Sequence, residues 1–435
     1  MARAESTLGG AKAWLNWVLA TFFVVMVFTL QTGYAITNVR IAEDLGLSLA
    51  QVGLIGSIYT WAFALVQFAS GSMMDSLGSR KTITFAAVLT TAGAFLFAGA
   101  GGPMQLVVGQ VLMALGGAFA FVGAGFVGAQ WFAPIKYGFM FALVQFVASL
   151  SAIGGQNAIG AFLSQGYNWS QIVYSMAFIS LGLTVVMFLL LRDPVRSDLE
   201  QRRWPGTKAF IDELFKAIGK CMAIRHTWIN ALIGGATFGS TLSLGIVWGP
   251  RYLIAAGMDE GQAFSVSAIM WLGLAIGAPL FAKWSDLVMK RKLPMFAGCL
   301  MQLVAILVIL MRPGMSPTEA YVWFFLWGLM AGGSILTFPI GADLVPASLI
   351  GTSAAVCNAI QFLVGGLLIA GPGRVLGGTG LVARVYERRA AVSGPFEGTV
   401  PDMQWALAIL PIALFLALLL FVPLKETYPK DEASS

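Results

Sequence analysis

Two arginines have a type and position suited to binding an anion. Arg40 and Arg251 each stand near the end of a long apolar run, and they lie 211 residues apart in the chain. A guanidinium offers a planar fork of N–H donors that matches a carboxylate, and its charge draws anions toward a cavity mouth. Two other interpretations are open: an outer gate in which Glu43 or Asp44 pairs with them, and anchoring at the lipid headgroups through a long side chain.

Polar and aromatic side chains inside the apolar runs are the other candidates for contact with a solute. Gln31, Tyr34 and Asn38, for example, share one face of the first run at helical spacing. The alternative for each of these side chains is hydrogen bonding or packing between helices. The full set is Gln31, Tyr34, Asn38, Tyr59, Gln145, Thr241, Trp248, Tyr252, Asn358 and Gln361.

Residues that support metal, redox or acid–base chemistry are scarce. His226 is the only histidine, and the three cysteines have neither pairable nor metal-ligand spacing. We therefore expect no metal site, no cofactor and no enzyme. No Asp or Glu lies in the middle third of any apolar run, so proton coupling through a buried carboxylate has no candidate. The remaining transport mechanisms are uniport, exchange and coupling through acidic residues in the loops.

The composition indicates that the chain carrying these residues is embedded in lipid. Of 435 residues, 58% are apolar and only 11% are charged, whereas roughly a quarter of a soluble domain is charged. A soluble chain this poor in charge would expose large apolar patches and aggregate. A net charge of +6 is typical of the cytoplasmic loops of a membrane protein. We expect a lipid bilayer and a small-molecule substrate as partners, and no nucleic acid.

Twelve apolar runs are long enough to span a bilayer as helices, which takes about 20 residues. They are too long and too continuous for the alternating strands of a membrane barrel. The sequence therefore predicts an all-α membrane protein with twelve transmembrane helices. The runs lie near 14–37, 49–74, 82–100, 104–130, 137–162, 169–191, 226–253, 262–284, 294–311, 318–341, 351–373 and 403–424.

The basic residues are divided unevenly between the two sides that these spans define. With the N-terminus inside, 19 of the 26 Lys and Arg residues fall on the cytoplasmic side and 7 on the other. Because positively charged loops stay inside, we expect both termini in the cytoplasm. We expect a multi-pass protein of the cell membrane, the inner membrane in a bacterium, and a monomer.

The chain contains two parallel copies of one unit. A shift of 211 residues pairs Arg40 with Arg251, Asp75 with Asp286 and Arg80 with Arg291. We predict two six-helix halves, residues 1–191 and 226–435, with the substrate path between them. The charged connection 192–225 has apolar residues at helical spacing, which predicts an amphipathic helix on the inner membrane surface.

A loop signature stands between the second and third spans. Residues 71–81 read GSMMDSLGSRK, and a degraded copy, AKWSDLVMKRK, occupies 282–292. The first copy resembles the G-x-x-x-D-R-x-G-R-K loop of the major facilitator superfamily, with departures at Ser76 and Ser79. With the twelve spans and the repeat, the signature identifies the chain as a member of that superfamily. The resemblance implies a secondary transporter that works by alternating access.

The signature residues are expected to form a latch at the cytoplasmic side. Asp75 can accept bonds from a neighbouring helix N-terminus or a cation, Gly71 permits a close helix approach and Gly78 permits a tight turn. Arg80 and Lys81 hold the loop to acidic groups, or alternatively only anchor the topology. We call these five residues the loop latch, together with the second-copy residues Asp286, Arg291 and Asp343.

Differences between this sequence and known subtypes of the superfamily narrow the range of possible substrates. Gln110 occupies the place of an arginine that is usual in proton-coupled drug exporters, and the buried carboxylates of sugar carriers are missing. A small organic anion such as a carboxylate fits the two arginines best. The alternatives are a drug or metabolite efflux carrier and a transporter-like solute sensor that signals through residues 192–225. Solute flux in proteoliposomes distinguishes a carrier from a sensor.

We expect Asp75→Asn to slow transport far more than it weakens substrate binding, because Asp75 lies in the loop signature and away from the polar candidates. Flux into proteoliposomes and equilibrium binding, measured on the same preparation, separate the two effects. Normal flux in a variant that expresses like the wild type would remove the latch role from Asp75.

Overall fold

The computed structural model describes residues 8–132, 137–194, 206–346, 349–378 and 398–428, without the side chains of residues 72, 75, 76, 137–139, 141 and 142, so the predicted role of Asp75 lies outside what it describes. Every regular element in these ranges is a helix, and twelve helical segments are long and apolar enough to cross a membrane. The all-α prediction with twelve spans is therefore confirmed. The segments are Gly10–Leu45, Leu49–Gly71, Ser79–Ala98, Pro103–Trp131, Leu143–Ser164, Trp169–Leu190, Arg225–Ala255, Glu260–Val288, Lys292–Met311, Pro317–Asp343, Ile350–Leu376 and Val400–Leu420.

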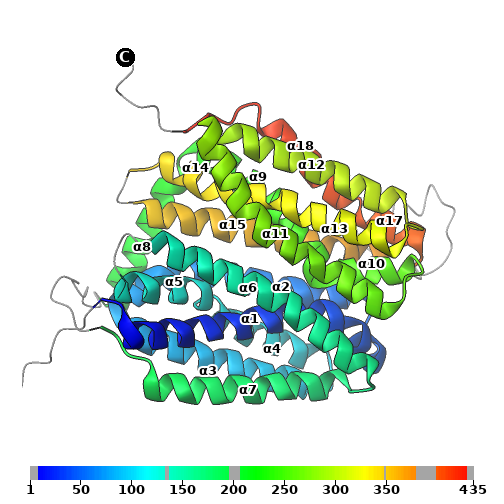
Figure 1. The fold of residues 1–435 in the computed structure, drawn as a ribbon, viewed down its shortest axis with the longest axis horizontal. Coiled ribbons are helices and arrows are strands. Elements are labelled where there is room, and N and C mark those ends of the chain that lie inside the picture. Colours follow the sequence, from blue (N-terminus) through cyan, green and yellow to red (C-terminus); the bar gives the residue numbers. More distant parts are fainter. Residues whose placement is uncertain (1–7, 133–136, 195–205, 347–348, 379–397, 429–435) are drawn as a thin grey trace, which may run out of the picture.

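The helices pack as two groups that follow one another in the chain (Figure 1). The first group, which we call the N-half, is drawn blue to teal; the second, the C-half, is drawn green to red. The N-half consists of α1 (Gly10–Leu45), α2 (Leu49–Leu77), α3 (Ser79–Ala98), α4 (Pro103–Gly117), α5 (Ala120–Trp131), α6 (Tyr137–Ser164) and α7 (Trp169–Leu190). The C-half consists of α9 (Arg225–Ser243), η2 (Leu244–Trp248), α10 (Gly249–Ala255), α11 (Glu260–Val288), α12 (Lys292–Met311), α13 (Pro317–Ala331), η3 (Gly332–Leu336), α14 (Thr337–Asp343), α15 (Ile350–Leu376), α17 (Val400–Leu407) and α18 (Ile409–Leu420).

One further helix, α8 (Thr207–Met222), lies at the end of the bundle where α7 ends and α9 begins (Figure 1). We call this the connection end and the opposite one the distal end. Cys221 of α8 is buried against α15, and burial raises the pKa of its thiol. Ile211 and Phe215 remain exposed beside lysines of the same helix. A helix with this division of side chains suits the boundary between headgroups and acyl chains.

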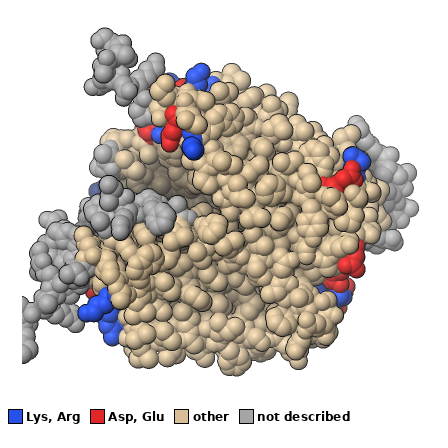
Figure 2. Space-filling view, in the orientation of Figure 1, with Lys and Arg blue, Asp and Glu red and all other residues tan. Residues whose placement is uncertain are grey.

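Charged side chains gather at the two ends of the molecule, and a broad uncharged belt separates them (Figure 2). A hydrocarbon layer offers no hydrogen-bond partners, so segments that cross it must satisfy their own backbone groups, as helices do. Several helices that begin at the distal end also carry their own side-chain caps. Ser48, Asn168 and Ser316 form capping boxes with the third residue of α2, α7 and α13, and Asp259 caps α11.

The C-half is held together in part by glycines that bring two backbones into contact. A Cβ atom on Gly328 of α13 would lie 1.9 Å from the carbonyl oxygen of Met270, and one on Gly277 of α11 would lie 2.1 Å from that of Leu329. Small residues allow such approach between membrane helices, where dispersion contacts replace the hydrophobic effect as the source of cohesion. The pairing of α11 with α13 therefore depends on these glycines.

We expect Gly328→Ala to lower the thermal stability of the purified protein clearly, because the added methyl group meets a backbone oxygen. Overpacking of this kind costs about 1–3 kcal/mol or more. The matched control is Gly182→Ala in the membrane helix α7, where a Cβ would meet nothing within 4 Å, and alanine favours a helix over glycine. Equal unfolding midpoints for the two variants would show that the close packing is not required.

Candidate functional site

The interface between the N-half and the C-half, which we call the seam, carries polar contacts at its distal end. Arg40 of α1 reaches Glu260 of α11 across the seam with an N–O distance of 2.6 Å, and it also pairs with Glu43 at 3.0 Å. These side chains are 33–57% exposed, so solvent screens them and their net stabilisation is small. The predicted Arg40–Glu43 pair is thus present, and Glu260 joins it from the other half.

Arg251 crosses the seam in the opposite direction and meets neutral oxygens. Its Nε donates to Oδ1 of Asn38, and its NH2 donates to the Asn38 carbonyl at 2.9 Å. Asn38 is fully buried, and its own amide donates to the carbonyls of Tyr34 and Ala35. The guanidinium is partly buried. A positive charge therefore rests at the seam on dipoles, in a place where an anion would neutralise it.

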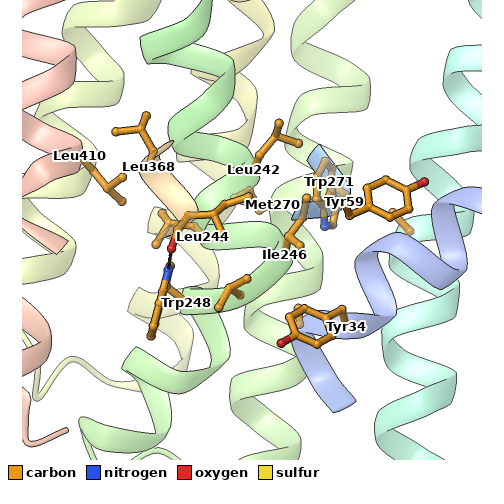
Figure 3. Close-up of a cluster of buried hydrophobic side chains, with 14 of the residues drawn as sticks. Tyr34, Tyr59, Leu242, Leu244, Ile246, Trp248, Met270, Trp271, Leu368 and Leu410 are labelled. Atoms are coloured by element: carbon orange, nitrogen blue, oxygen red, sulfur yellow. Dashed lines mark hydrogen bonds between the residues drawn. The ribbon is translucent and has the colours of Figure 1, made fainter. Parts of the chain in front are cut away.

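Trp248 closes the seam beside this arginine. Its indole N–H donates to the carbonyl of Ile369 at 2.8 Å, within the C-half. Its ring edge packs against α2, because a Cβ atom on Gly53 would lie 3.1 Å from it. Figure 3 shows Trp248 and the residues before it on one face of the buried cluster, with Tyr34 and Tyr59 of the N-half on the other side.

Two neighbouring residues of α6 extend the closed region. Asn157 accepts a hydrogen bond from Ser265 of α11 at 2.9 Å, and Gln156 donates to the carbonyl of Gly245 at 3.0 Å. Toward the middle of the spans, Trp61 of α2 donates to the carbonyl of Leu363 at 3.2 Å.

An aromatic contact completes the closure at this depth. The ring of Phe63 lies 4.5 Å from that of Phe362, measured between centroids, and the two rings belong to different halves. Tyr59 stacks on Phe63 at 6.1 Å. The seam is therefore tightly packed from its middle to the distal end.

The connection end differs. Among the described residues, the hydrogen bonds and ion pairs there stay within one half. Figure 2 shows the surface hollowed between the two halves on this side. Gly71 fits this picture, because a Cβ atom on it would meet nothing within 4 Å. The close helix contact expected at Gly71 is therefore absent from this conformation.

The loop-latch residues of the C-half do come together. Arg291 pairs with Asp343 at 3.3 Å and with Asp286 at 3.5 Å, and its guanidinium lies 4.9 Å from the centroid of the Tyr428 ring. Glu426 accepts from the backbone N–H groups of Arg291 and Lys292 at 2.7 and 3.1 Å, which caps the start of α12.

The loop-latch residues of the N-half use a matching device. Asp193 accepts from the Ser79 hydroxyl at 2.6 Å and from the backbone N–H of Arg80 at 3.0 Å, so it caps α3. Gly78 has φ +83°, and a Cβ atom there would lie 2.7 Å from Asp193, so the turn needs glycine for two reasons. The Arg80 guanidinium donates to the carbonyl of Phe188 at 3.1 Å, whereas Lys81 is exposed.

Sequence reasoning missed both capping carboxylates. They follow the last helix of each half within similar tripeptides, Leu-Arg-Asp at 191–193 and Leu-Lys-Glu at 424–426. A comparison of the ends of the two repeats would have found this signal. Because each carboxylate acts on a helix far away in the chain, local capping rules could not.

Several predicted binding residues make their described hydrogen bonds within one half and not across the seam. Thr241 accepts from Gln302 of α12 at 2.9 Å, and Tyr252 donates to the carbonyl of Ile309 at 2.8 Å, both inside the C-half. Tyr34 bonds within the N-half, to the carbonyl of Val52. The remaining candidates, of which none has a described bond across the seam, are Gln31 and Gln361, which are buried, and Gln145 and Asn358, which are half-buried.

The sequence profile of the Major Facilitator Superfamily matches residues 17–369. The chain belongs to this superfamily. It is 24% identical over 355 residues to the probable galactarate/D-glucarate transporter of Escherichia coli (strain K12), covering 74% of this chain and 79% of that protein. It is 25% identical over 351 residues to the gentisate transporter of Corynebacterium glutamicum, covering 77% and 75%. The protein is thus a secondary transporter of a small solute, and not an enzyme.

Solved structures agree on the fold. A bacterial homolog to the human lysosomal transporter Spinster, solved in an inward-facing and unoccupied conformation, superposes with a TM-score of 0.73 at 16% identity, covering 95% of this chain and 98% of that one. The nucleoside transporter NupG superposes with a TM-score of 0.70 at 14% identity, covering 94% and 99%. The arrangement of twelve helices in two parallel halves is that of the superfamily.

Glu426 gives the C-half cap a pH dependence. Burial raises the pKa of Glu426, but hydrogen bonds from the backbone N–H groups of Arg291, Tyr428, Lys292 and Thr427 outweigh it and hold the pKa below its ordinary value of 4.5. A carboxyl whose pKa is lowered by folding stabilises the fold fully above its unfolded pKa. That contribution is lost as the pH falls through the folded pKa.

We therefore expect Glu426→Gln to unfold at a lower temperature than the wild type at pH 7, with the difference shrinking below about pH 4.5. Thermal unfolding in detergent from pH 7 to pH 3 measures this. Glu213→Gln, at an exposed position of α8, is the control and should leave the curve unchanged. A difference for Glu426→Gln that stays constant with pH would contradict the capping role.

Proposed function

We propose that this transporter carries a small organic anion and that Arg251 is the side chain that binds it. The observation that carries the proposal is the partly buried guanidinium at the seam, whose described hydrogen bonds go to the neutral oxygens of Asn38. A charge whose hydrogen bonds go to neutral oxygens, and on which Glu43 acts without a described ion pair, is less well compensated than one paired directly with a carboxylate. A carboxylate substrate would supply the missing negative charge when the seam opens.

The relatives support an anionic substrate. Their names specify galactarate or D-glucarate, D-galactonate, sulfoacetate and gentisate, all of which are organic acids. Arginine suits this class because its planar fork binds both carboxylate oxygens at once.

Arg40 has a different role in this proposal. Its pairs with Glu43 and Glu260 already compensate its charge, so it contributes to closing the distal end rather than to binding. The two arginines are equivalent in the repeat, but their partners differ. In this proposal Arg40 therefore closes the distal end and Arg251 binds the anion.

The proposal also includes the orientation of the molecule in the membrane. The connection end faces the cytoplasm with both termini, and the distal end faces outward, in the inner membrane of a bacterium. This follows from the excess of Lys and Arg on the connection side. Residues 1–191 and 226–435 move as two bodies joined by 192–225, the path between them serves one monomer, and the loop-latch residues engage when the connection end closes.

Binding of a panel of anions tests the substrate class: D-glucarate, D-galactonate, sulfoacetate and gentisate. For any panel anion that the wild type binds, we expect Arg251→Gln to weaken binding roughly tenfold or more, because a hydrogen bond between charged groups contributes about 1.5–3 kcal/mol. Arg251→Lys should recover part of this loss, and Arg40→Gln should have a smaller effect. Isothermal titration of the purified protein measures the affinities.

The matched control is Arg312→Gln, since Arg312 also lies at the distal end but pairs with Glu319 inside the C-half. It should bind like the wild type. If Arg251→Gln also binds and transports like the wild type, Arg251 is an interfacial anchor and the anion proposal loses its support.

A further inference from the structure

One turn of the seventh span departs from α-helical geometry. Residues Leu244–Trp248 form a π-helix between α9 and α10, and the backbone N–H of Gly249 donates to the carbonyl of Leu244. In a regular α-helix that N–H would serve Gly245 instead. The next residue, Pro250, has no N–H to offer. The carbonyl of Gly245 therefore loses both its α-helical and its π-helical donor.

Gln156 of the N-half supplies the missing donor. Its Nε2 donates to the Gly245 carbonyl at 3.0 Å and to the carbonyl of Thr32 in α1, also at 3.0 Å. The Gln156 side chain is fully buried. A carbonyl buried away from water needs a hydrogen-bond donor, so one amide group ties α6, α1 and the π-turn of the C-half together.

The repeat shows that the fold does not require the π-turn. In the N-half the equivalents of Gly245, Gly249 and Pro250 are Tyr34, Asn38 and Val39, at the same offset of 211 residues. That helix, α1, runs unbroken from Gly10 to Leu45. A turn with poorer internal bonding, kept in only one of two equivalent helices, is typical of a functional position.

The other end of the same amide is unpaired. Oε1 of Gln156 is buried and accepts no hydrogen bond among the described residues. The amide thus uses its donors fully and its acceptor not at all, which fits a contact made in only one of two conformations. When the distal end opens, the Gln156–Gly245 bond must break, and water or solute can reach both groups.

We propose that Gln156 is a positioning residue of the transport cycle. Its amide holds the distal end of the seam closed by satisfying the carbonyl that the π-turn and Pro250 leave without a donor. This hydrogen bond stabilises the closed conformation, and its strength sets how often the distal end opens. This role is independent of the substrate and of Arg251.

A double-mutant cycle between Gln156 and Pro250 tests the proposal. Gln156→Leu removes the donor, and Pro250→Ala adds an N–H within the helix that competes for the same carbonyl. Spin labels are placed at Gln165 and Thr318, which are exposed positions at the distal ends of the two halves. Pulsed electron paramagnetic resonance measures the distance between the labels and so reports the fraction of open molecules. Each single variant should raise the ratio of open to closed molecules roughly 2- to 10-fold, as expected for one hydrogen bond.

The double variant gives the decisive result. In the Pro250→Ala background, Gln156→Leu should add little, because the carbonyl no longer depends on Gln156. The matched control is Gln67→Leu, which removes a buried amide that donates to the carbonyl of Ala118 inside the N-half, and it should leave the open fraction unchanged. Additive effects, or an unchanged open fraction in both single variants, would overturn the proposal. Pro250→Ala keeps the test valid if Gln156→Leu fails to fold.

Discussion

The rule that polar groups inside a membrane need partners governs this structure. With charge confined to the two ends (Figure 2), the spans contact one another through glycines, aromatic rings and single hydrogen bonds. Across the seam these bonds cluster from mid-depth to the distal end, at Gln156, Asn157 and Asn38. Because each contact consists of one or two hydrogen bonds and involves no ion pair, the halves are joined firmly enough to exclude water and weakly enough to separate.

The two halves repeat in sequence but divide their tasks. Arg40 and Arg251 are equivalent in the repeat, yet one meets carboxylates and the other meets the dipoles of Asn38. The first helix of the N-half is an unbroken α-helix, and that of the C-half contains a π-turn. At the connection end the symmetry returns, since Asp193 and Glu426 cap equivalent helices. Symmetry therefore holds where each half is stabilised by itself and breaks where the halves meet.

The sequence was sufficient for the fold, because apolar runs, loop charges and a 211-residue repeat are properties of the chain alone. It also named Arg251, Asn38 and Trp248 as binding candidates, and these three lie together at the seam. It could not decide which face of each helix meets the seam, so Thr241 was included although Gln302 holds it inside the C-half. Glu260 and Gln156 acquire their roles only through partners on the other half, which no local pattern reveals.

Transport in this structure requires the distal end of the seam to part. Asn157 and Ser265 face one another there, from α6 and α11, at 2.9 Å. The direct test replaces both by cysteine, bridges them with a short bis-methanethiosulfonate cross-linker that attaches to each thiol through a disulfide bond, and measures flux of a bound panel anion in proteoliposomes. Bridging should abolish flux, and reduction should restore it. Flux at the unbridged rate while the cross-link is intact would contradict this requirement.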